Sequence, residues 1–483
     1  MLGPTERVHL CTPGARHEAI VSLRRADSVS AVLAAFAEAS ETGQPLTLVG
    51  GRRSFGGQGF PTGGALGLDV GALERGATAL ETEADGSLWI RAGGGTRFCD
   101  VHQSFPGYRA HGGPTTDSVT LAGSLSACVH NIMGYFADEV RAFTLLTPAG
   151  ERIACRRDAK GRSGELFEAC VGAFGCLGVV TDIELRLRPV ERDSAEVVIE
   201  SRYAGSAKGC AYLAALEVAT DDPQHDAGAG ALMFGCEGHA IVLGQRFVPD
   251  GQLIADQRAP LTDDDHERNA LTQGLSNRFP RLAGLAISRA YPKGRACWAD
   301  WYGSSYYQRS YDRAASILRG RGPHLALARA VGVDPRLPVY HQSWFFPRDR
   351  LREVMALYWA VLRRYPGVES RAETQDLVLL PPSRWPLHTS GAGPEALGVL
   401  TSSFAVRPET KNAARVSAFL ARFSRLVWER VPSCRVSLCK QIHCDTDMLR
   451  AMHASWIETI RGWRAQTDPE GLLRSRFMAK LGL

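Results

Sequence analysis

The sequence predicts an α+β protein built from two domains. The chain has 483 residues, more than one ordinary hydrophobic core accommodates. Hydrophobic residues make up 45% of it and charged residues 22%, as in soluble globular proteins. Short strand and helix patterns alternate up to about Pro189, whereas the middle of the chain carries long units of one strand followed by one helix. This change of pattern indicates that the two domains differ in architecture.

The first part of the chain has the pattern of short strands and short helices. Residues 28–41, "SVSAVLAAFAEASE", have the apolar spacing of a helix, and Ser28 is a suitable N-cap. Alternation and turn residues then predict, in order, a strand at 45–49, strands within 64–70 and 87–96, a helix at 96–105, two strands around a Pro-Ala-Gly turn at 140–155, and a helix leading into a long strand at 164–190. Asp138 and Glu139 fall in a predicted solvated turn before residue 140.

The middle of the chain predicts an antiparallel sheet covered by helices. In residues 337–365 and again in 398–431, strand alternation gives way to a helical period after a proline and charged residues. Residues 434–443, "CRVSLCKQIH", are predicted to form a final strand. The remaining residues are predicted to form two helices, separated at Asp468-Pro469.

Composition excludes several classes of protein. The net charge is only +5, from 56 basic and 51 acidic residues, so no nucleic-acid partner is expected. The twelve cysteines lack the spacing of a zinc site or a CxxC motif, so no metal is expected. The first residues, "MLGPTERVHLC", do not have the pattern of a signal peptide, and no apolar run reaches the ~18 residues that span a bilayer. These observations predict a cytoplasmic protein.

The stretch "LVGGRRSFGGQGF", residues 48–60, contains five glycines directly after a predicted strand. It lacks the Lys-Ser or Lys-Thr pair of a phosphate-binding P-loop, and it does not open a helix as the dinucleotide fingerprint G-x-G-x-x-G requires. Two interpretations stay open. The loop is either an anion-binding arrangement of backbone N–H groups or a tight hairpin connection.

Two further glycine-rich segments follow, "PTTDSVTLAGSLSACVHN" at 114–131 and "GAFGCLGVVTDIELRLRP" at 172–189. In this order, the three segments resemble the FAD-binding domain of the vanillyl-alcohol oxidase family of flavoproteins. The resemblance covers about the first 190 and the last 50 residues. It implies that the first segment wraps the FAD pyrophosphate through backbone N–H groups, that the second runs along the isoalloxazine and the diphosphate, and that the third lies on the adenine side.

The resemblance assigns cofactor-binding residues in each segment. They are Gly50, Gly51, Arg52, Arg53, Ser54, Phe55 and Gly56 in the first; Pro114, Thr115, Thr116, Ser118, Val119, Ala122, Gly123, Ser126 and Ala127 in the second; and Gly175, Gly178, Val179 and Val180 in the third. Asp69 is interpreted as structural or flavin-contacting. The family attaches flavin covalently through a His in the first loop or a Cys near Gly112 and Gly113, and this sequence has neither. Non-covalent FAD is therefore expected.

Within the family, the motifs resemble most the branch of decaprenylphosphoryl-ribose oxidase and the sugar and alditol oxidases. "GRRSFGG", the run ending in "SACVH", the late "RVSLCKQ" and the last helix "DPEGLLRSRFMAKLGL" carry this likeness. It implies a discontinuous FAD-binding domain, residues 1–192 and 432–483, with a substrate-binding domain at 193–431 between its parts. It also implies oxidation of a secondary alcohol of a sugar-like or polyol substrate to a ketone by hydride transfer to flavin.

The same likeness leaves the rest of the reaction open. The oxidation is either complete in itself or the first half of an epimerisation that a reductase partner completes, and the electron acceptor is O₂ or another molecule. Two rival interpretations are an FAD-dependent oxidase or dehydrogenase of a natural-product scaffold, which a pocket lined by Trp344, Phe345 and Trp385 would favour, and a flavoprotein that binds FAD without turnover.

Lys440 and His130 are the candidate catalytic residues. The resemblance places Lys440 at the end of a late strand near the flavin, where an amine or ammonium handles the alcohol oxygen. The alternative is a solvent-facing lysine. His130 follows small residues that permit close approach to the ring, and its alternative is a histidine satisfied in the core.

Four residues are candidates for substrate binding. His341 and Ser343 are two apart in one predicted strand and so share a face, and the likeness favours this face over that of Tyr340. Thr401 lies on a neighbouring predicted strand. Asn131 stands where relatives have glycine after the His, which implies a reshaped substrate-facing loop.

Overall fold

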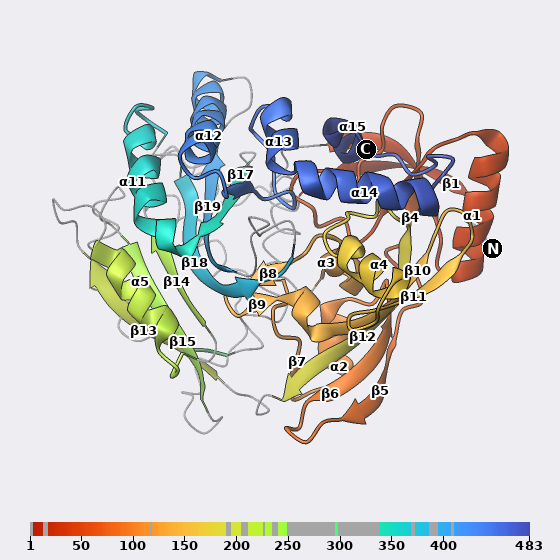
Figure 1. The fold of residues 1–483 in the computed structure, drawn as a ribbon, viewed down its shortest axis with the longest axis horizontal. Coiled ribbons are helices and arrows are strands. Elements are labelled where there is room, and N and C mark those ends of the chain that lie inside the picture. Colours follow the sequence, from red (N-terminus) through yellow and green to blue (C-terminus); the bar gives the residue numbers. More distant parts are fainter. Residues whose placement is uncertain are drawn as a thin grey trace, which may run out of the picture. The chain divides into compact units, whose positions relative to one another are not determined.

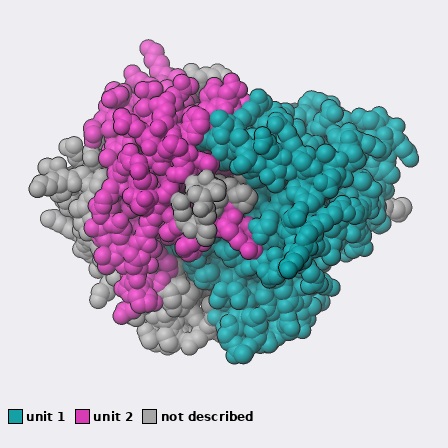
Figure 2. Space-filling view, in the orientation of Figure 1, with its two compact units in different colours: residues 1–13, 17–192, 449–483 teal, residues 14–16, 193–448 magenta. Residues whose placement is uncertain are grey.

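The computed structural model describes residues 3–12, 18–114, 118–189, 195–203, 211–225, 228–233, 240–248, 295–297, 339–368, 372–385, 395–406 and 410–483. The chain divides into two compact units (Figure 2). Unit 1 comprises residues 1–13, 17–192 and 449–483, and unit 2 comprises residues 14–16 and 193–448. Both units mix helices and sheets, in agreement with the α+β prediction.

Unit 1 contains the short strands and helices that the sequence predicts, together with several short elements that it does not predict. They are β1 (Thr5–Cys11), β2 (Glu18–Arg25), α1 (Val29–Thr42), β3 (Leu46–Val49), β4 (Leu66–Asp69), β5 (Ala77–Thr82), β6 (Leu88–Gly93), α2 (Phe98–Ser104), β7 (Tyr108–Arg109), α3 (Leu121–Ser126), β8 (His130–Asn131), β9 (Gly134–Tyr135), the 3-10 turn η1 (Phe136–Glu139), β10 (Val140–Leu146), β11 (Arg152–Arg156), α4 (Arg162–Cys170), β12 (Val179–Pro189), α14 (Ala454–Thr467) and α15 (Arg476–Leu481), with α13 (Thr446–Met452) at the boundary between the units.

The helix α1 forms as its sequence predicts. The Ser28 side chain accepts a hydrogen bond from the Ala31 amide at 3.4 Å, which satisfies one of the free N–H groups of the first turn. Gly43 ends the helix in the left-handed conformation, with φ of 66°. The buried side chains of α1, among them Val32 and Phe36, recur at helical spacing and form one apolar face.

Unit 1 has two principal sheets (Figure 1). In the first, of order β1-β2-β4-β3, the strands β1 and β2 are antiparallel, and β4 is parallel to both of its neighbours. The second has the order β11-β10-β12-β6-β5, with β7 also paired to β12, and its neighbouring strands are antiparallel. A third, short sheet consists of β8 and β9.

Two buried carboxylates form ion pairs with arginines of the second sheet. Glu139 is 2% exposed and accepts hydrogen bonds from Arg186 at 2.8 Å and from Arg188 at 2.9 Å. Glu184 likewise accepts from Arg91 and Arg141. The prediction of a solvated turn at Glu139 was wrong, because its carboxylate turns inward to these two arginines of β12.

Unit 2 is built on one large antiparallel sheet. Its described elements are β13 (Ala195–Tyr203), α5 (Ala211–Asp221), β14 (Gly228–Met233), β15 (Ala240–Val248), β16 (Arg295–Cys297), β17 (Val339–Pro347), the 3-10 turn η4 (Arg348–Arg350), α11 (Leu351–Leu362), β18 (Ala372–Ser383), β19 (Glu395–Ala405), α12 (Lys411–Arg430) and β20 (Arg435–Val436). The strand order is β16-β13-β15-β14-β18-β19-β17-β20.

One face of this sheet lies under helices (Figure 1), as the sequence predicts. Gln342 and Trp344 of β17 both donate to the hydroxyl of Ser424 on α12, at 2.7 and 2.9 Å. Ser402 of β19 is hydrogen-bonded to the hydroxyl of Tyr358 on α11 at 2.9 Å. The even-numbered residues of these two strands therefore face the helices, and the odd-numbered residues face the other side.

The structure differs from the sequence prediction near the end of the chain. Within the predicted strand 434–443, only Arg435–Val436 forms a strand, and it pairs with β17 of unit 2. Residues 432–448, which the sequence assigns to the first domain, therefore group with unit 2, and the chain returns to unit 1 at Leu449. The last residues form α13, α14 and α15 where two helices were predicted, because the first predicted helix is interrupted at His453, between α13 and α14.

Candidate functional site

The first glycine-rich loop connects β3 to β4, and these two strands are parallel. A hairpin turn joins only antiparallel strands, so the hairpin interpretation of this loop was wrong. The loop, residues 50–65, instead crosses from the end of one strand to the beginning of its parallel neighbour. It therefore stands outside the carboxyl end of β3, where open sheets place their ligands.

An ion pair fixes the conformation of this loop. Arg52 has φ of 59°, in the left-handed region that non-glycine residues rarely adopt. Its guanidinium donates to Oδ2 of Asp69, the last residue of β4, and Oδ1 of Asp69 accepts from the Gly71 amide at 2.9 Å. Asp69 therefore has a structural role, holding the loop, which was one of the two interpretations of this residue.

The far end of the loop is held by the C-terminal part of unit 1. The Arg476 amide donates to the Phe60 carbonyl at 3.0 Å, and its Nε donates to the Pro61 carbonyl at 3.1 Å. Leu46, at the start of β3, donates to Leu472 and accepts from Arg474 through backbone hydrogen bonds of 2.7 and 2.8 Å. No local sequence pattern indicates these contacts, since the partners are more than four hundred positions apart.

The first and second glycine-rich segments contact each other. A Cβ atom built on Gly51 would lie 3.3 Å from the Thr120 amide nitrogen and 3.5 Å from the Ser118 carbonyl oxygen. A Cβ atom on Gly50 would lie 3.6 Å from Oγ1 of Thr120. Glycine at position 51 therefore lets the two backbones approach more closely than a side chain would allow.

The second and third segments are joined by backbone hydrogen bonds. The Phe174 amide donates to the Ser126 carbonyl at 2.8 Å, and the Gly172 amide donates to the Leu125 carbonyl at 3.1 Å. A fourth cluster, Gly93 to Gly95, connects to both, because Gly94 donates to Thr181 at 2.7 Å and accepts from Ala122 at 3.2 Å. The cluster is visible in the sequence, but its hydrogen bonds to the second and third segments were not predicted.

The predicted cofactor-binding residues thus come from segments that the structure brings together. Gly50, Gly51, Arg52, Arg53, Ser54, Phe55 and Gly56 lie in the first loop; Pro114, Ser118 and Val119 precede α3; Ala122, Gly123 and Ser126 lie on α3, with Ala127 as its C-cap; Gly175 and Gly178 lie between α4 and β12; and Val179 and Val180 begin β12. Thr115 and Thr116 lie outside the described residues.

The residues of these segments suit FAD. At Gly51 the two backbones meet without side chains between them, which is the kind of surface that binds a pyrophosphate through N–H groups. Arg53 adds positive charge to the first loop, whereas the charge of Arg52 is paired with Asp69. Ser124 of α3 is fully buried, and within the described residues its hydroxyl has no hydrogen-bond partner.

His130 lies in the short hairpin of β8 and β9. Its ring is 5.9 Å from that of Tyr135, centre to centre. Asn131 is 5% exposed, and its side-chain oxygen accepts from the Met133 amide at 2.7 Å, which stabilises the turn of the hairpin. The catalytic role of His130 and the substrate-binding role of Asn131 stay predictions.

A second group of predicted residues meets on the face of the unit 2 sheet opposite to α11 and α12. His341 and Ser343 of β17 are paired in register with Ser403 and Thr401 of β19. The hydroxyls of Ser343 and Thr401 are 2.9 Å apart, and the His341 Nδ1 is hydrogen-bonded to Ser403. We call this set of residues, together with Asp376, the polar face.

Asp376 of β18 belongs to the polar face, although sequence reasoning missed it. It is paired in register with Thr401, so Asp376, Thr401 and Ser343 form one row across three neighbouring strands. Burial raises the pKa of Asp376 from 3.8 to about 7, and the positive charge of Lys440 opposes this rise. A charged residue within the apolar run "DLVLL" was the available signal.

Lys440 follows β20 beside β17 in unit 2. The backbone on either side of it is held to β17, since Ser437 donates to the Ser343 carbonyl at 2.9 Å and Gln441 donates to the His341 carbonyl at 3.0 Å. Burial lowers the pKa of His341 well below 6.5, and the positive charge of Lys440 lowers it further. Lys440 therefore acts electrostatically on both Asp376 and His341, and the structure brings it together with the predicted residues of β17 and β19.

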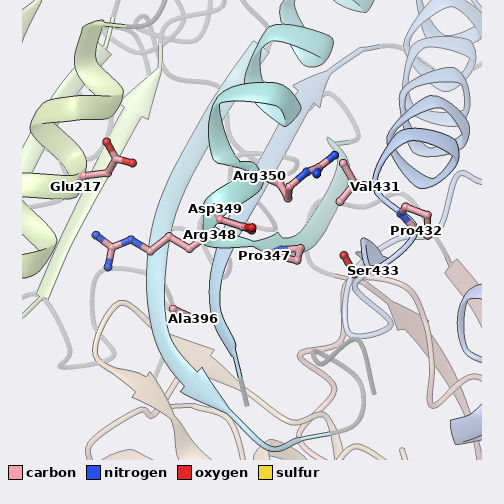
Figure 3. Close-up of a pocket in the computed structure, with 9 residues that line it drawn as sticks. All are labelled: Glu217, Pro347, Arg348, Asp349, Arg350, Ala396, Val431, Pro432 and Ser433. Carbon is pink, nitrogen blue, oxygen red and sulfur yellow. The ribbon is translucent and has the colours of Figure 1, made fainter. Parts of the chain in front are cut away.

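A pocket of about 830 Å³ lies elsewhere in unit 2 (Figure 3). Its labelled side chains come from α5, the end of β17, η4, β19 and the segment after α12. Arg348, one of them, is paired with Asp221, and Arg350 is paired with Glu353. Pro347 is four residues from Ser343 along β17, or about 13 Å, so this pocket is separate from the polar face.

The described part of the chain holds no group of three or more His, Cys, Asp or Glu side chains arranged to bind a metal ion. None of its helices is both long enough and apolar enough to cross a membrane.

The comparison with known families agrees with the geometry of unit 1. Residues 21–156 match the family model described as an FAD binding domain. This span includes the first and second glycine-rich segments and both strands that flank the first loop. No curated protein matches the chain. The chain therefore carries an FAD-binding domain within unit 1, and such a domain indicates an FAD-dependent oxidoreductase.

Proposed function

We propose that this protein oxidises a secondary alcohol of a sugar-like or polyol substrate to a ketone, with FAD as the hydride acceptor. The observation that carries the proposal is the polar face, where Ser343 and Thr401 hydroxyls lie 2.9 Å apart next to a histidine and an aspartate. Neighbouring hydroxyl, imidazole and carboxyl groups can donate to and accept from several hydroxyls of one substrate. A hydroxyl-rich molecule is therefore the ligand that this surface suits best.

FAD is held by the three glycine-rich segments in this proposal, and when bound it supplies a two-electron acceptor. The backbone of the first loop binds the pyrophosphate, Arg53 contributes charge, and Arg52 holds the loop through its ion pair with Asp69. The attachment is non-covalent, because the first loop contains no histidine and no cysteine stands beside Gly112 and Gly113. Acid precipitation of the purified protein is expected to release the yellow flavin into the supernatant, and colour retained in the pellet would refute this attachment.

Lys440 stabilises the alcohol oxygen as negative charge develops on it. Its backbone neighbours are fixed to β17 at His341 and Ser343, the two strand residues proposed to bind substrate. A cation that acts mainly on charge formed during the reaction lowers the barrier without tightening substrate binding. Replacement of Lys440 should therefore reduce the rate more than the affinity.

The test is Lys440→Ala, with Lys411→Ala as the matched control. Lys411 is an exposed residue of the first turn of α12. Flavin reduction is followed anaerobically against a panel of sugars and polyols, after the FAD content of each variant has been checked. The loss of one such contact is typically worth about 10²–10³ in rate. If Lys440→Ala reduces its flavin within about threefold of the wild type, Lys440 does not have this role, and His130 is the next residue to replace.

The fate of the electrons and of the ketone belongs to the same proposal. The reduced protein is reoxidised by O₂ or by another acceptor, and the ketone is either the final product or is reduced by a partner enzyme that completes an epimerisation. Oxygen consumption with substrate identifies the first acceptor. Recovery of the ketone as the only product shows that the oxidation stands alone.

The rival natural-product substrate has lost part of its support. Trp344, one of the aromatic residues expected to line such a pocket, donates to Ser424 under α12 and is fully buried. It therefore contributes to the core between sheet and helices.

A further inference from the structure

Asp376 occupies a position on the polar face that its neighbours fix. The preceding residue, Gln375, donates to Tyr358 of α11 and so faces the helices. Since successive residues of a strand point to opposite sides, Asp376 faces away from the helices, toward the side of Thr401 and Ser343. The residue as a whole is half-buried. Its Oδ1 atom is buried, and within the described part of the chain it has no hydrogen-bond partner.

Among the described residues, few charged groups lie around Asp376. Lys440 acts on it, and His341, itself influenced by His443, lies on the same face of the sheet. Its register partners, Leu232 of β14 and Thr401 of β19, carry no charge. The acidic residues of α5, Glu217 and Asp221, are paired with Arg352 and Arg348. Asp376 is therefore a half-buried carboxyl group whose Oδ1 atom is buried, with a lysine as its cationic neighbour.

Oxidation of an alcohol needs an acceptor for the hydroxyl proton as well as for the hydride. We propose that Asp376 is this acceptor and that it works together with Lys440; the inference rests on the proposed function. The hydroxyl proton passes to Oδ1 of Asp376, the hydrogen on the carbinol carbon leaves with its electron pair to FAD, and the C–O bond becomes C=O. The alcohol loses two electrons and FAD gains them.

The other candidates on the polar face are less suited to take the proton. His341 already uses Nδ1 in its hydrogen bond to Ser403, and burial disfavours its protonated form. Lys440 in its charged form has no lone pair to accept a proton, but it stabilises the oxygen from which the proton departs. Asp376 has a buried carboxyl oxygen, and its raised pKa of about 7 brings it close to neutral pH, where a general base is most effective.

The first experiment tests Asp376 without any substrate. Infrared difference spectra of the protein are recorded over a pH titration for the wild type, Asp376→Asn and the control Asp349→Asn. Asp349 is exposed in η4. A protonated-carboxyl band that disappears with a midpoint near pH 7 is expected in the wild type and the control, and it is expected to be absent from Asp376→Asn. A wild-type band that does not titrate between about pH 6 and pH 8 overturns the proposal.

The second experiment measures flavin reduction against pH. In the wild type the rate should rise with pH through about 7, as Asp376 loses its proton. Asp376→Asn should lower the rate by about 10²–10⁴, abolish this rise and leave the substrate Kd within about threefold. Asp376→Glu should recover part of the rate together with the pH dependence. An Asp376→Asn enzyme that keeps the wild-type rate and profile contradicts the proposal.

The two experiments separate failure of the inference from failure of the proposed function. If no sugar or polyol reduces the wild-type flavin, the proposed function fails, and the infrared titration still decides whether Asp376 titrates as a base should. If Asp376→Asn does not accumulate as folded protein, Asp376→Glu supplies the titration, and the inference is lost if the band of that variant does not shift from the wild-type midpoint.

Discussion

One carboxylate oxygen of Asp69 accepts a hydrogen bond from the guanidinium of Arg52, and the other accepts one from the amide of Gly71. A single side chain at the end of β4 therefore fixes the first glycine-rich loop. We expect Asp69→Ala to weaken FAD binding by about tenfold, since a hydrogen bond to a charged group contributes about 1.5–3 kcal/mol and Arg52 is partly exposed. Fluorescence titration of the apoprotein with FAD measures this change. Asp158→Ala, at an exposed position of unit 1, should leave the affinity unchanged, and equal affinities in the two variants would contradict the anchoring role.

The contact between the first two glycine-rich segments predicts a difference between two glycines of one loop. At Gly51 a methyl group would lie 3.3 Å from the Thr120 amide nitrogen, whereas at Gly63 nothing lies within 4 Å. Gly51→Ala should therefore push the segments apart and reduce the FAD content of the purified protein at least severalfold, while Gly63→Ala should retain it. The ratio of flavin absorbance to protein absorbance is the measurement, and a full complement of FAD in Gly51→Ala would count against the assembly described for unit 1.

The two faces of the unit 2 sheet predict different effects for neighbouring hydroxyls. Loss of Thr401, in Thr401→Val, should raise KM by about three- to tenfold, because a net hydrogen bond is worth about 0.5–1.5 kcal/mol, and should change kcat less. Ser402→Ala should leave KM unchanged and lower the unfolding free energy, because Ser402 is buried against Tyr358 under the helices. Steady-state kinetics and urea unfolding of both variants test this contrast between the two faces. A larger KM in Ser402→Ala than in Thr401→Val would contradict it.

The carboxylate of Glu139 predicts a purely structural effect. Its side chain is 3% exposed and holds Arg186 and Arg188, so Glu139→Gln should lower the free energy of unfolding by about 2 kcal/mol. Glu81, which is 57% exposed and paired with Arg141, serves as the control, since exposed ion pairs contribute about 0–1 kcal/mol. Urea denaturation of Glu139→Gln and Glu81→Gln gives both values, and equal losses would show that burial does not distinguish the two pairs.

Elements whose signals are local could be predicted from the sequence. The helix α1 has its cap, its apolar face and its terminal glycine within residues 28–43, and the hairpin of β10 and β11 follows directly from its Pro-Ala-Gly turn. The loop after β3 is different. Its flanking strands are parallel neighbours in the sheet, and this pairing is not encoded in the loop itself, so local residues left the hairpin interpretation open.

The two-residue alternation of strands predicted part of the candidate site. The two-residue period grouped His341 with Ser343, and the family resemblance then favoured their face. Asp376 was missed because its place beside Thr401 is a matter of register between β18 and β19, which no single strand encodes. Glu139 was wrongly assigned to solvent for a similar reason, since its two arginine partners are 47 and 49 positions further along the chain.

The hydrogen bonds from Arg476 to Phe60 and Pro61 have a consequence for how the protein is made. Arg476 and Pro61 are separated by 415 positions, so the ribosome must synthesise nearly all of the chain shown here before the first loop can be closed. Contacts between such distant residues form late and slowly in folding. Unit 1 therefore cannot complete its FAD-binding loop during early translation, and a nascent chain arrested before residue 472 should bind FAD more weakly than the released protein.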